Sequence, residues 1–459
     1  MGIDPNNPPI TSNICGIQRQ TYADLPNATS VDAFTLAWVE QTVGMAPAGL
    51  YISTVSAPQG THQWQWVGPA TGGGGMNLGI ANFDAFGRLR VSTPQTVFNS
   101  KFVYDAQPLY WSEAQTGGAA AGVWSSANAR IRLSATTGQT SLRQTRRYFS
   151  YQPGKSQLVF QTFCMGPAVA GAITRIGYFD SGNGVFFERD GSALSFVRRS
   201  SSATATTTAP QASWNLDTLD GNGPSGVTLD PTKTQIFIMD LEWLGVGSVR
   251  CGFVIDGQII YAHRFDCANI EIAVYMSTPN LPLRYELDAT AAVDPAYLDC
   301  ICGTVMSEGG ESSIGEPFGF DSSPSGNVGN NASKTLFSIR HNASYERVTV
   351  IPTQVVPLAI GNGVTQWRLV YNAAIAGGTW TTTQGFCDID TAGTATGGTV
   401  IASGVISQAA PAVALNLEKS TLTLGATVAG VSDTMSLVVT NVSGGNERYI
   451  GAINWIALT

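Results

Sequence analysis

Two acidic residues on one short apolar segment are the strongest candidates for chemistry in this sequence. Segment 236–243 alternates along a predicted β-strand, so Asp240 and Glu242 point to the same face, with α-carbons about 6.8 Å apart. Retaining glycoside hydrolases hold two carboxyl groups about 5 to 5.5 Å apart, so the pair has suitable chemistry for cleaving a glycosidic bond. The alternative is a structural pair that contacts a cation such as Arg175 or Arg250.

The other motifs that resemble catalytic or metal sites are incomplete. The stretch Asp388-Ile-Asp390 begins like a calcium loop, yet Ala392 and Thr399 stand where oxygen ligands are needed. The sequence has no Gly-x-Ser-x-Gly nucleophile elbow, and we expect His263 to lie at the surface near a strand end. We therefore predict no catalytic residue, no metal and no cofactor.

The seven cysteines are odd in number and scattered, which is not the pattern of a disulfide framework. The pair Cys300-Ile-Cys302 lacks the two-residue spacing of zinc knuckles. We expect buried free thiols. The cysteines are Cys15, Cys164, Cys251, Cys267, Cys300, Cys302 and Cys387.

The elements around the acidic pair read as short β-strands. Runs of β-branched and aromatic residues are bounded by Gly, Asp, Asn or Pro, which is typical of strands that end in turns. Asp190-Gly191 and Asp256-Gly257 lie between such runs, and Asp-Gly supplies the positive φ angles of a two-residue type I′ hairpin. The sequence therefore predicts an antiparallel β-sandwich with two tight hairpins.

Segment 175–286 resembles a concanavalin-like jelly roll in the order of its strands and turns. Glucanases with that fold carry three acids on one strand, and here Ile238 stands where the first would be. The resemblance therefore implies an architecture rather than an activity. We favour the structural interpretation of Asp240 and Glu242 and expect that the chain is not an enzyme.

Composition and charge narrow the classes of partner. With 51 Gly, 22 Pro and 12% charged residues, the 459-residue chain suits many short strands and turns. A net charge of −8 argues against nucleic acid, because phosphate binding needs a concentrated Lys/Arg face. No apolar run approaches the roughly 20 residues of a membrane helix, and the start lacks the features of a secretory signal. We expect synthesis and retention in a cytoplasm.

The organisation predicted along the chain is all-β and multi-domain, with a central jelly roll and a small N-terminal β module. Gly- and Pro-rich stretches mark the boundaries. The predicted parts are an extended arm (1–20), a small β docking module (21–70), a Gly-rich linker (71–82), the jelly roll (83–307), a linker or long loop (308–334) and a C-terminal β-sandwich (335–459).

Three stretches in a fixed order resemble virion proteins of tailed bacteriophages. Residues 82–94 contain Phe-Gly-Arg-Leu-Arg-Val-Ser, and 97–101 continue as Val-Phe-Asn-Ser-Lys; residues 146–156 read Arg-Arg-Tyr-Phe-Ser-Tyr-Gln-Pro-Gly-Lys-Ser, and the jelly roll follows. Module 21–70 is similar to small β modules near the amino ends of phage fibre and other tail proteins. The resemblance covers residues from about 20 to 290 and brings no enzymatic residues with it.

What this resemblance implies is a structural role in a virion assembled in the bacterial host. We expect a tail protein (fibre, baseplate or tail tip) that docks through its N-terminal region and contributes to host attachment. Unpaired strand edges favour self-association, and the family implies a trimer that contacts other tail or capsid proteins. The alternatives are a capsid decoration or head-fibre protein, a carbohydrate-binding module and a glycoside hydrolase.

Three aromatic residues are candidates for contact with a host surface glycan. Tyr110, Trp111 and Trp380 could stack on sugar rings if their side chains are exposed. The alternative is that each belongs to a hydrophobic core, which is where large aromatic side chains in β-sandwiches mostly lie. Exposure of the three rings separates these interpretations.

Overall fold

The computed structural model describes the chain as two compact units, residues 1–90 and 91–459. The all-β fold class is confirmed: besides strands, the described residues hold two single-turn 3₁₀ helices, Gln211–Ser213 and Ala343–Tyr345. None of the helices in the described part has the length and apolar character that crossing a bilayer requires. The described residues are 17–19, 36–39, 49–56, 61–69, 83–85, 88, 94–310, 315–383, 385–407, 415–417 and 422–459.

The first unit contains a four-stranded sheet in the order β1-β2-β3-β4. Its strands are β1 (Ile17–Arg19), β2 (Leu36–Val39), β3 (Gly49–Ser56) and β4 (Thr61–Pro69). β1 pairs in parallel with β2, and the other pairs are antiparallel. Most of the predicted arm and the whole predicted linker 71–82 lie outside the described residues.

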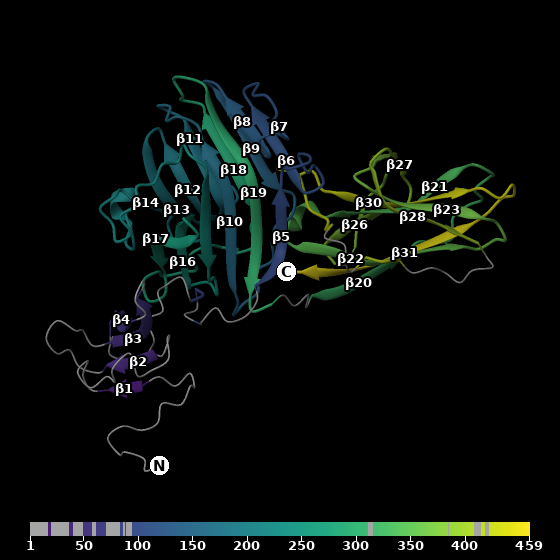
Figure 1. Ribbon diagram of the computed structural model, residues 1–459. Helices are drawn as coiled ribbons and strands as arrows, with labels where there is room; N and C mark the ends of the chain where they lie inside the picture. Colours follow the sequence, from purple (N-terminus) through teal and green to yellow (C-terminus); the bar gives the residue numbers. More distant parts are fainter. Residues whose placement is uncertain are drawn as a thin grey trace, which may run out of the picture. The chain divides into compact units, whose positions relative to one another are not determined.

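The jelly roll in the second unit consists of two facing antiparallel sheets (Figure 1). The β15 sheet has the order β17-β16-β15-β10-β19-β8-β7, with β5 also paired to β19, and the β11 sheet has the order β14-β13-β12-β11-β18-β9-β6. The strands of the β15 sheet are β5 (Gln95–Lys101), β7 (Val123–Ser125), β8 (Arg130–Ala135), β10 (Ser156–Met165), β15 (Gln235–Leu241), β16 (Ser248–Ile255), β17 (Gln258–Asp266) and β19 (Ala296–Glu308). Those of the β11 sheet are β6 (Trp111–Thr116), β9 (Gln139–Thr145), β11 (Ile173–Phe179), β12 (Gly184–Asp190), β13 (Ala193–Arg199), β14 (Thr207–Pro210) and β18 (Leu283–Ala289).

Alternation along β15 places its side chains as the sequence predicts. Phe237, Met239 and Leu241 are fully buried in the core between the two sheets. Ile238 and Asp240 point to the outer face of the β15 sheet, since successive side chains of a strand alternate. Burial of a Phe or Leu side chain contributes about 1.5–3 kcal/mol, so this face fixes the register of the strand.

The two Asp-Gly hairpins differ in their turns. Asp256 and Gly257 connect β16 to β17 with φ angles of +51° and +75°, the pattern predicted for a type I′ turn. Between β12 and β13, however, Asp190 pairs with Ala193, so the loop residues are Gly191 and Ser192. Of these two, Gly191 alone has a positive φ, +55°, which is the type II′ pattern. The hairpin is correct and its predicted turn is displaced by one residue.

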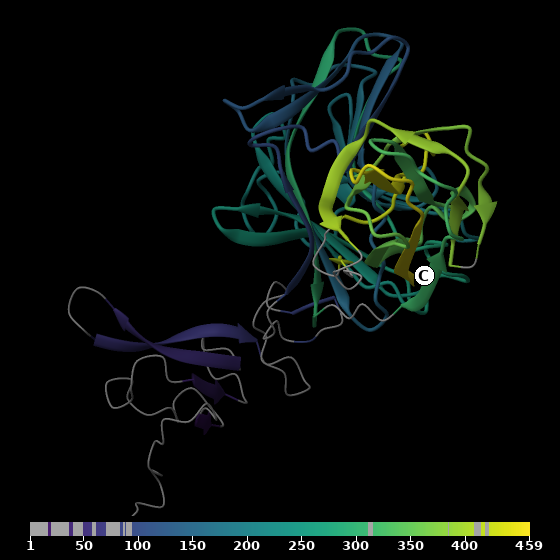
Figure 2. The same ribbon diagram turned by 90° about the vertical axis from the view of Figure 1, so that its right-hand side faces the viewer.

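The C-terminal sandwich packs a four-stranded sheet, β20-β31-β22-β29, against a six-stranded sheet, β25-β26-β21-β30-β23-β28, and adds the pair β24-β27. It is coloured light green to yellow and faces the viewer in Figure 2. Its strands are β20 (Glu316–Asp321), β21 (Ser333–His341), β22 (Thr349–Ala359), β23 (Thr365–Tyr371), β24 (Ala374–Ala376), β25 (Thr381–Thr382), β26 (Cys387–Asp390), β27 (Thr394–Thr396), β28 (Thr399–Ile406), β29 (Leu415–Asn416), β30 (Thr434–Asn441) and β31 (Tyr449–Leu458).

β20 lies inside the stretch predicted as a linker or long loop. Phe318 and Phe320 alternate with exposed positions, and their rings contact Trp455 and Phe337 of the C-terminal core. The high Gly, Pro and Ser content of 308–334 hides this short alternating pattern. Part of the predicted linker is therefore an edge strand of the sandwich, paired with β31.

Candidate functional site

Asp240 is closed off by neighbouring side chains. Its carboxylate is fully buried, forms an ion pair with Arg250, and accepts hydrogen bonds from Ser156 Oγ at 2.6 Å and Tyr261 Oη at 3.0 Å. Glu242 lies just past the end of β15 and is half-buried. The sequence left two interpretations of this acidic pair, a catalytic pair and a structural pair in contact with a cation. The structure contains the contact with a cation, between Asp240 and Arg250. A buried carboxylate held by three donors is a structural group, because its charge is neutralised within the sheet.

A second set of charges lies on the outer face of the β11 sheet. Arg175 on β11 receives one carboxylate from each neighbouring strand: Nε is 2.7 Å from Glu188 Oε2, and Nη1 is 2.5 Å from Glu286 Oε1. Burial alone would lower the pKa of Arg175, but the two carboxylates outweigh burial and raise it. The three side chains share a row because Arg175 pairs with Glu188 on one side and with Glu286 on the other. The sequence did not predict this row of charges, because Arg175, Glu188 and Glu286 are brought together only by the pairing register of three strands.

The candidate glycan-contact residues do not share one surface. Trp111 is 2% exposed, and its indole Nε1 donates to Ser100 Oγ at 2.8 Å inside the jelly-roll core, so it is closed to a ligand. Tyr110 is half-buried beside Phe98. Trp380 is also half-buried, and a guanidinium lies 4.2 Å from its ring centre. Glycan contact by Tyr110 and Trp380 stays a prediction.

The calcium-like stretch is a hydrogen-bonded turn. Asp390 accepts backbone N–H groups from Thr379 at 2.7 Å and Gly393 at 2.9 Å, and Asp388 forms an ion pair with Arg340. These donors occupy the oxygen atoms that a cation would need. Within the described ranges, no three His, Cys, Asp or Glu side chains are grouped so that they could hold a metal ion.

The described cysteines are free thiols. Burial raises the pKa of Cys300 well above its ordinary value, and Cys251 is shifted in the same direction by the same cause. A thiol in such surroundings stays protonated and behaves as a small apolar side chain. Cys15 lies outside the described residues.

His263 is buried, although the sequence suggests a surface position. A β-bulge opposite Cys251 and Gly252 shifts the alternation of β17 and turns His263 inward, where it is 8% exposed. Its ring packs against Phe265 at 4.5 Å between centres, and the backbone N–H of Asn215 donates to Nδ1 at 3.3 Å. Burial lowers its pKa to about 4, so the imidazole is neutral at physiological pH.

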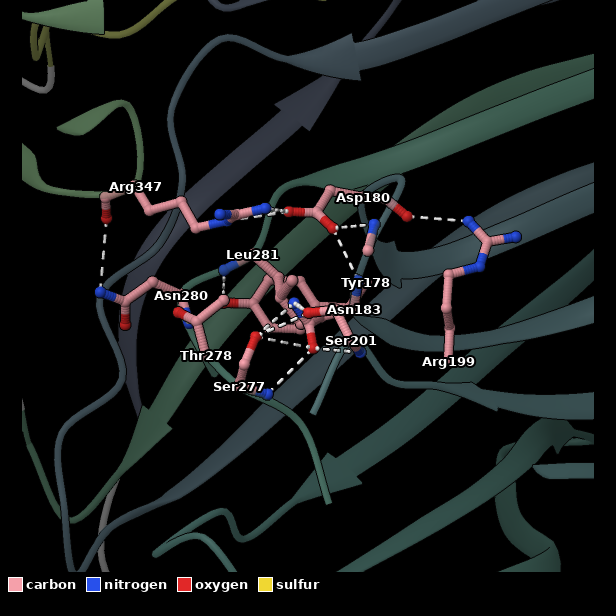
Figure 3. Close-up of polar contacts among 11 residues, drawn as sticks. Tyr178, Asp180, Asn183, Arg199, Ser201, Ser277, Thr278, Asn280, Leu281 and Arg347 are labelled. Atoms are coloured by element: carbon pink, nitrogen blue, oxygen red, sulfur yellow. Dashed lines mark hydrogen bonds and ion pairs between the residues drawn. The ribbon is translucent and has the colours of Figure 1, made fainter. Parts of the chain in front are cut away.

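An ion pair between a half-exposed arginine and a buried carboxylate joins the jelly roll to the C-terminal sandwich (Figure 3). Arg347, just before β22, contacts Asp180 Oδ2 through Nη2 at 2.6 Å and Nε at 3.0 Å, and Asp180 is 2% exposed. Arg199 donates to the backbone oxygen of Asp180, and the side chain of Asn280 donates to the backbone oxygen of Arg347. Burial would lower the pKa of Arg347, but the hydrogen bonds and charge of Asp180 raise it.

The turn that carries Asp180 is itself fixed by Asn183, which is 1% exposed. The side-chain nitrogen of Asn183 donates to the hydroxyls of Ser201 and Ser277, both at 2.9 Å, and its oxygen accepts their backbone N–H groups (Figure 3). The backbone N–H of Asn183 donates to Asp180 Oδ1 at 2.8 Å. A fully satisfied network of this kind holds the carboxylate in place for Arg347.

A second ion pair between an arginine and a buried carboxylate lies at another point of the junction. Arg146 Nη1 lies 2.6 Å from Asp433 Oδ1, and Tyr371 Oη donates to the other carboxylate oxygen at 2.8 Å. Burial, together with Asp433, raises the pKa of Tyr371 well above its ordinary value. Beside them, Gly425 approaches the backbone of Arg146 so closely that a Cβ would lie 2.3 Å from the carbonyl oxygen. The two pairs bind the sandwiches into the single compact unit 91–459.

Five aliphatic side chains are exposed on two loops at one end of the jelly roll, and we call them the apolar loop patch. The backbone N–H of Tyr275 donates to Gly245 O at 2.9 Å, and Trp243 Nε1 donates to Met276 O at 3.2 Å, so the two loops are neighbours. The residue Leu244 has a φ of +37°, a strained conformation for a non-glycine residue. A sequence signal for this patch exists, because its aliphatic residues stand in segments that lack the alternation of a β-strand. The patch residues and their exposures are Leu244 (50%), Val246 (44%), Ile270 (66%), Ile272 (94%) and Val274 (37%).

Comparison with known proteins finds similarity in structure. No family model matches the chain, and no curated protein matches its sequence. A β-glucanase from Bacillus licheniformis is 12% identical with a TM-score of 0.31, over 47% of this chain and 99% of its own. A β-1,3-glucanase from Mycobacterium marinum is 10% identical with a TM-score of 0.32, over 47% and 100%. A protein of unknown function from Shewanella oneidensis MR-1 is 11% identical with a TM-score of 0.32, over 52% and 96%.

These neighbours correct one expectation. We expected that the chain is not an enzyme, and this is contradicted because several of the similar structures are glycoside hydrolases, including a family 16 protein from Mycobacterium smegmatis. At 10–12% identity the similarity describes the fold, and no activity of those proteins is transferred to this chain.

Proposed function

We propose that this chain is a structural component of a tailed-bacteriophage virion, placed in the tail, and that it self-associates through the apolar loop patch. The sequence support is the fixed order of three stretches that resemble tailed-phage virion proteins. The docking role assigned to residues 1–70 falls mainly outside the described residues, so it remains an expectation from the sequence.

The observation that carries the proposal is the apolar loop patch. Exposed aliphatic groups that gather on neighbouring loops mark a contact surface, whereas scattered ones do not. Within the patch, Glu271 stands between Ile270 and Ile272, and its carboxylate is already paired with Arg198 Nη2 at 2.6 Å in the same chain. Two copies of the patch can therefore meet without repulsion between like charges. The partner that fits is a second copy of this chain, arranged around a symmetry axis.

The test compares two substitutions at opposite ends of the jelly roll. Ile272→Asp places a charge in the patch, and Val293→Asp does the same at a residue that is 69% exposed in the β18–β19 loop. We expect the wild-type chain and the Val293→Asp variant to be trimers by native mass spectrometry, and the Ile272→Asp variant to shift toward monomer. A wild-type monomer at micromolar concentration, or an unchanged trimer in the Ile272→Asp variant, refutes self-association through the patch.

Position in the virion is a separate question with its own measurement. Immunogold electron microscopy with an antibody against residues 335–459 should label the tail of intact particles. Label over the head would replace the tail assignment with the capsid-decoration alternative. Particles without label would refute the virion role.

A further inference from the structure

A polar groove of about 390 Å³ opens in the C-terminal sandwich. Its walls are the end of β20, the loop 322–326 that follows it, the beginning of β21, and Thr391 after β26. Most of the lining residues carry a hydroxyl group or a charge. A concave site of this volume is within the usual range for small-molecule ligands.

The floor of the groove presents hydroxyl groups held in fixed positions. Thr335 is 3% exposed and its Oγ1 accepts the backbone N–H of Ala395 at 2.9 Å; Ser322 is 4% exposed and its Oγ accepts the backbone N–H of Gly451 at 3.0 Å. A hydroxyl that accepts one hydrogen bond keeps its own proton to donate. The floor therefore offers oriented donors to a ligand at little cost in side-chain entropy.

The rim carries one charge of each sign. Asp321 is exposed at the end of β20, and Lys334 is half-buried near the start of β21. In the described part of the chain, neither side chain belongs to an ion pair within 4 Å. The groove is thus lined by a carboxylate that accepts hydrogen bonds and an ammonium that donates them, and their charges cancel.

One aromatic ring completes the lining. Phe320 is partly buried, and its ring packs edge-to-face on Phe337 at 5.9 Å between centres. An aromatic surface beside a carboxylate and several hydroxyl groups suits a ligand with one C–H face and several adjacent hydroxyls. A saccharide has this chemistry, and the balanced rim favours a neutral one over an acidic one.

We propose that this groove binds a neutral saccharide, with Asp321 accepting hydrogen bonds from adjacent sugar hydroxyls and Lys334 and Ser323 donating to others. The binding itself rests on the groove alone. The further step, that this binding attaches a virion to a host glycan, rests on the proposed virion function. The site differs from the three aromatic candidates of the sequence, because none of Tyr110, Trp111 and Trp380 lines the groove.

The experiment uses the full chain and two groove variants. The wild type is screened on an array of neutral saccharides (glucose-, galactose-, mannose- and N-acetylglucosamine-terminated) and acidic ones, and the best ligand is titrated by calorimetry. We expect a neutral ligand, and a loss of about 10- to 100-fold in affinity for each variant. Asp321→Asn replaces a charged acceptor by a neutral one, and Lys334→Met removes a charged donor. Asp294→Asn, at an exposed carboxylate on the jelly roll, is the matched control and should bind like the wild type.

Several results would overturn the groove assignment. These are no saccharide binding at millimolar concentration, binding that both groove variants retain, or a preference for acidic saccharides that Asp321→Asn does not weaken. Both substituted side chains lie at the rim, so folding is checked by circular dichroism and a matching thermal midpoint. Because the trimer is measured separately, failure of saccharide binding is distinguishable from failure of the proposed assembly.

Discussion

The outer faces of the jelly roll and the groove of the C-terminal sandwich differ in how their charged side chains are paired. On the faces of the jelly roll, Arg175 is shared by two carboxylates and Asp240 is neutralised by Arg250. In the C-terminal sandwich, Asp321 and Lys334 stand at an open groove. On the outer faces of the jelly roll, therefore, ion pairs tie neighbouring strands of one sheet together, whereas the charges at the groove are available to a ligand. The two proposals accordingly fall on different domains, self-association on the jelly roll and saccharide binding on the C-terminal sandwich.

The largest effect is expected where the two sandwiches are joined. Asp433→Ala removes the acceptor of Arg146, Tyr371 and Asn372, and leaves a buried cation without its partner. Breaking a buried pair costs about 3–5 kcal/mol. Urea unfolding followed by tryptophan fluorescence and by circular dichroism should show that loss, with two separated transitions in place of one.

The matched control for this variant is an exposed ion pair on the jelly roll. Arg264 and Asp266 are 45% and 42% exposed, so Asp266→Ala should change the free energy of unfolding by less than about 1 kcal/mol. If Asp433→Ala and Asp266→Ala have equal effects, the junction does not couple the two sandwiches.

Acid should destabilise the jelly roll through His263. Its pKa is about 4 in the folded chain and about 6.5 when unfolded, so the unfolded state binds the extra proton between these values. Stability from the neutral imidazole is present above pH 6.5 and falls as pH drops toward 4, by about 3 kcal/mol in total. Burial also lowers the pKa of His341 in the C-terminal sandwich, so both regions lose stability in the same direction.

Unfolding free energies measured by urea at pH 7, 5.5 and 4 check this expectation. The His263→Gln variant should have a shallower dependence on pH than the wild type, and the remaining slope reports His341 and the carboxylates. Equal slopes for the variant and the wild type would show that His263 titrates normally in the folded chain.

A smaller effect is expected at the close approach between the sandwiches. Gly425→Ala introduces a Cβ that would lie 2.3 Å from Arg146 O, so one backbone must move. Overpacking of this kind costs about 1–3 kcal/mol. Gly445→Ala is the control, because a Cβ there meets open space. Thermal unfolding of the two variants compares them, and equal midpoints would mean that the junction tolerates displacement at Gly425.

Local patterns predicted the strands and faces, but not which partners those faces meet. Alternation along β15 placed Phe237 and Met239 in the core, because a two-residue period depends on neighbours in sequence alone. The sequence suggested Arg175 and Arg250 as possible cations for Asp240, and it is the cross-strand register that places Arg250 opposite it. Arg347 lies 167 residues from Asp180, and nothing in the sequence pointed to that pair. The groove likewise needs β20, which its Gly- and Ser-rich surroundings conceal. Contacts between distant segments carry no short-range signal.

The position of β31 in its sheet has a consequence for biosynthesis. β31 lies between β20 and β22, and it contributes the fully buried Trp455 to the core. The ribosome makes β20 about 130 residues before β31. The edges of β20 and β22 that pair with β31 therefore stay unpaired until β31 has been translated. Open edges of this kind recruit other chains. Yield of soluble protein should therefore respond to translation rate and chaperone supply through this sandwich, while the jelly roll, whose strands are all made by residue 308, can close earlier.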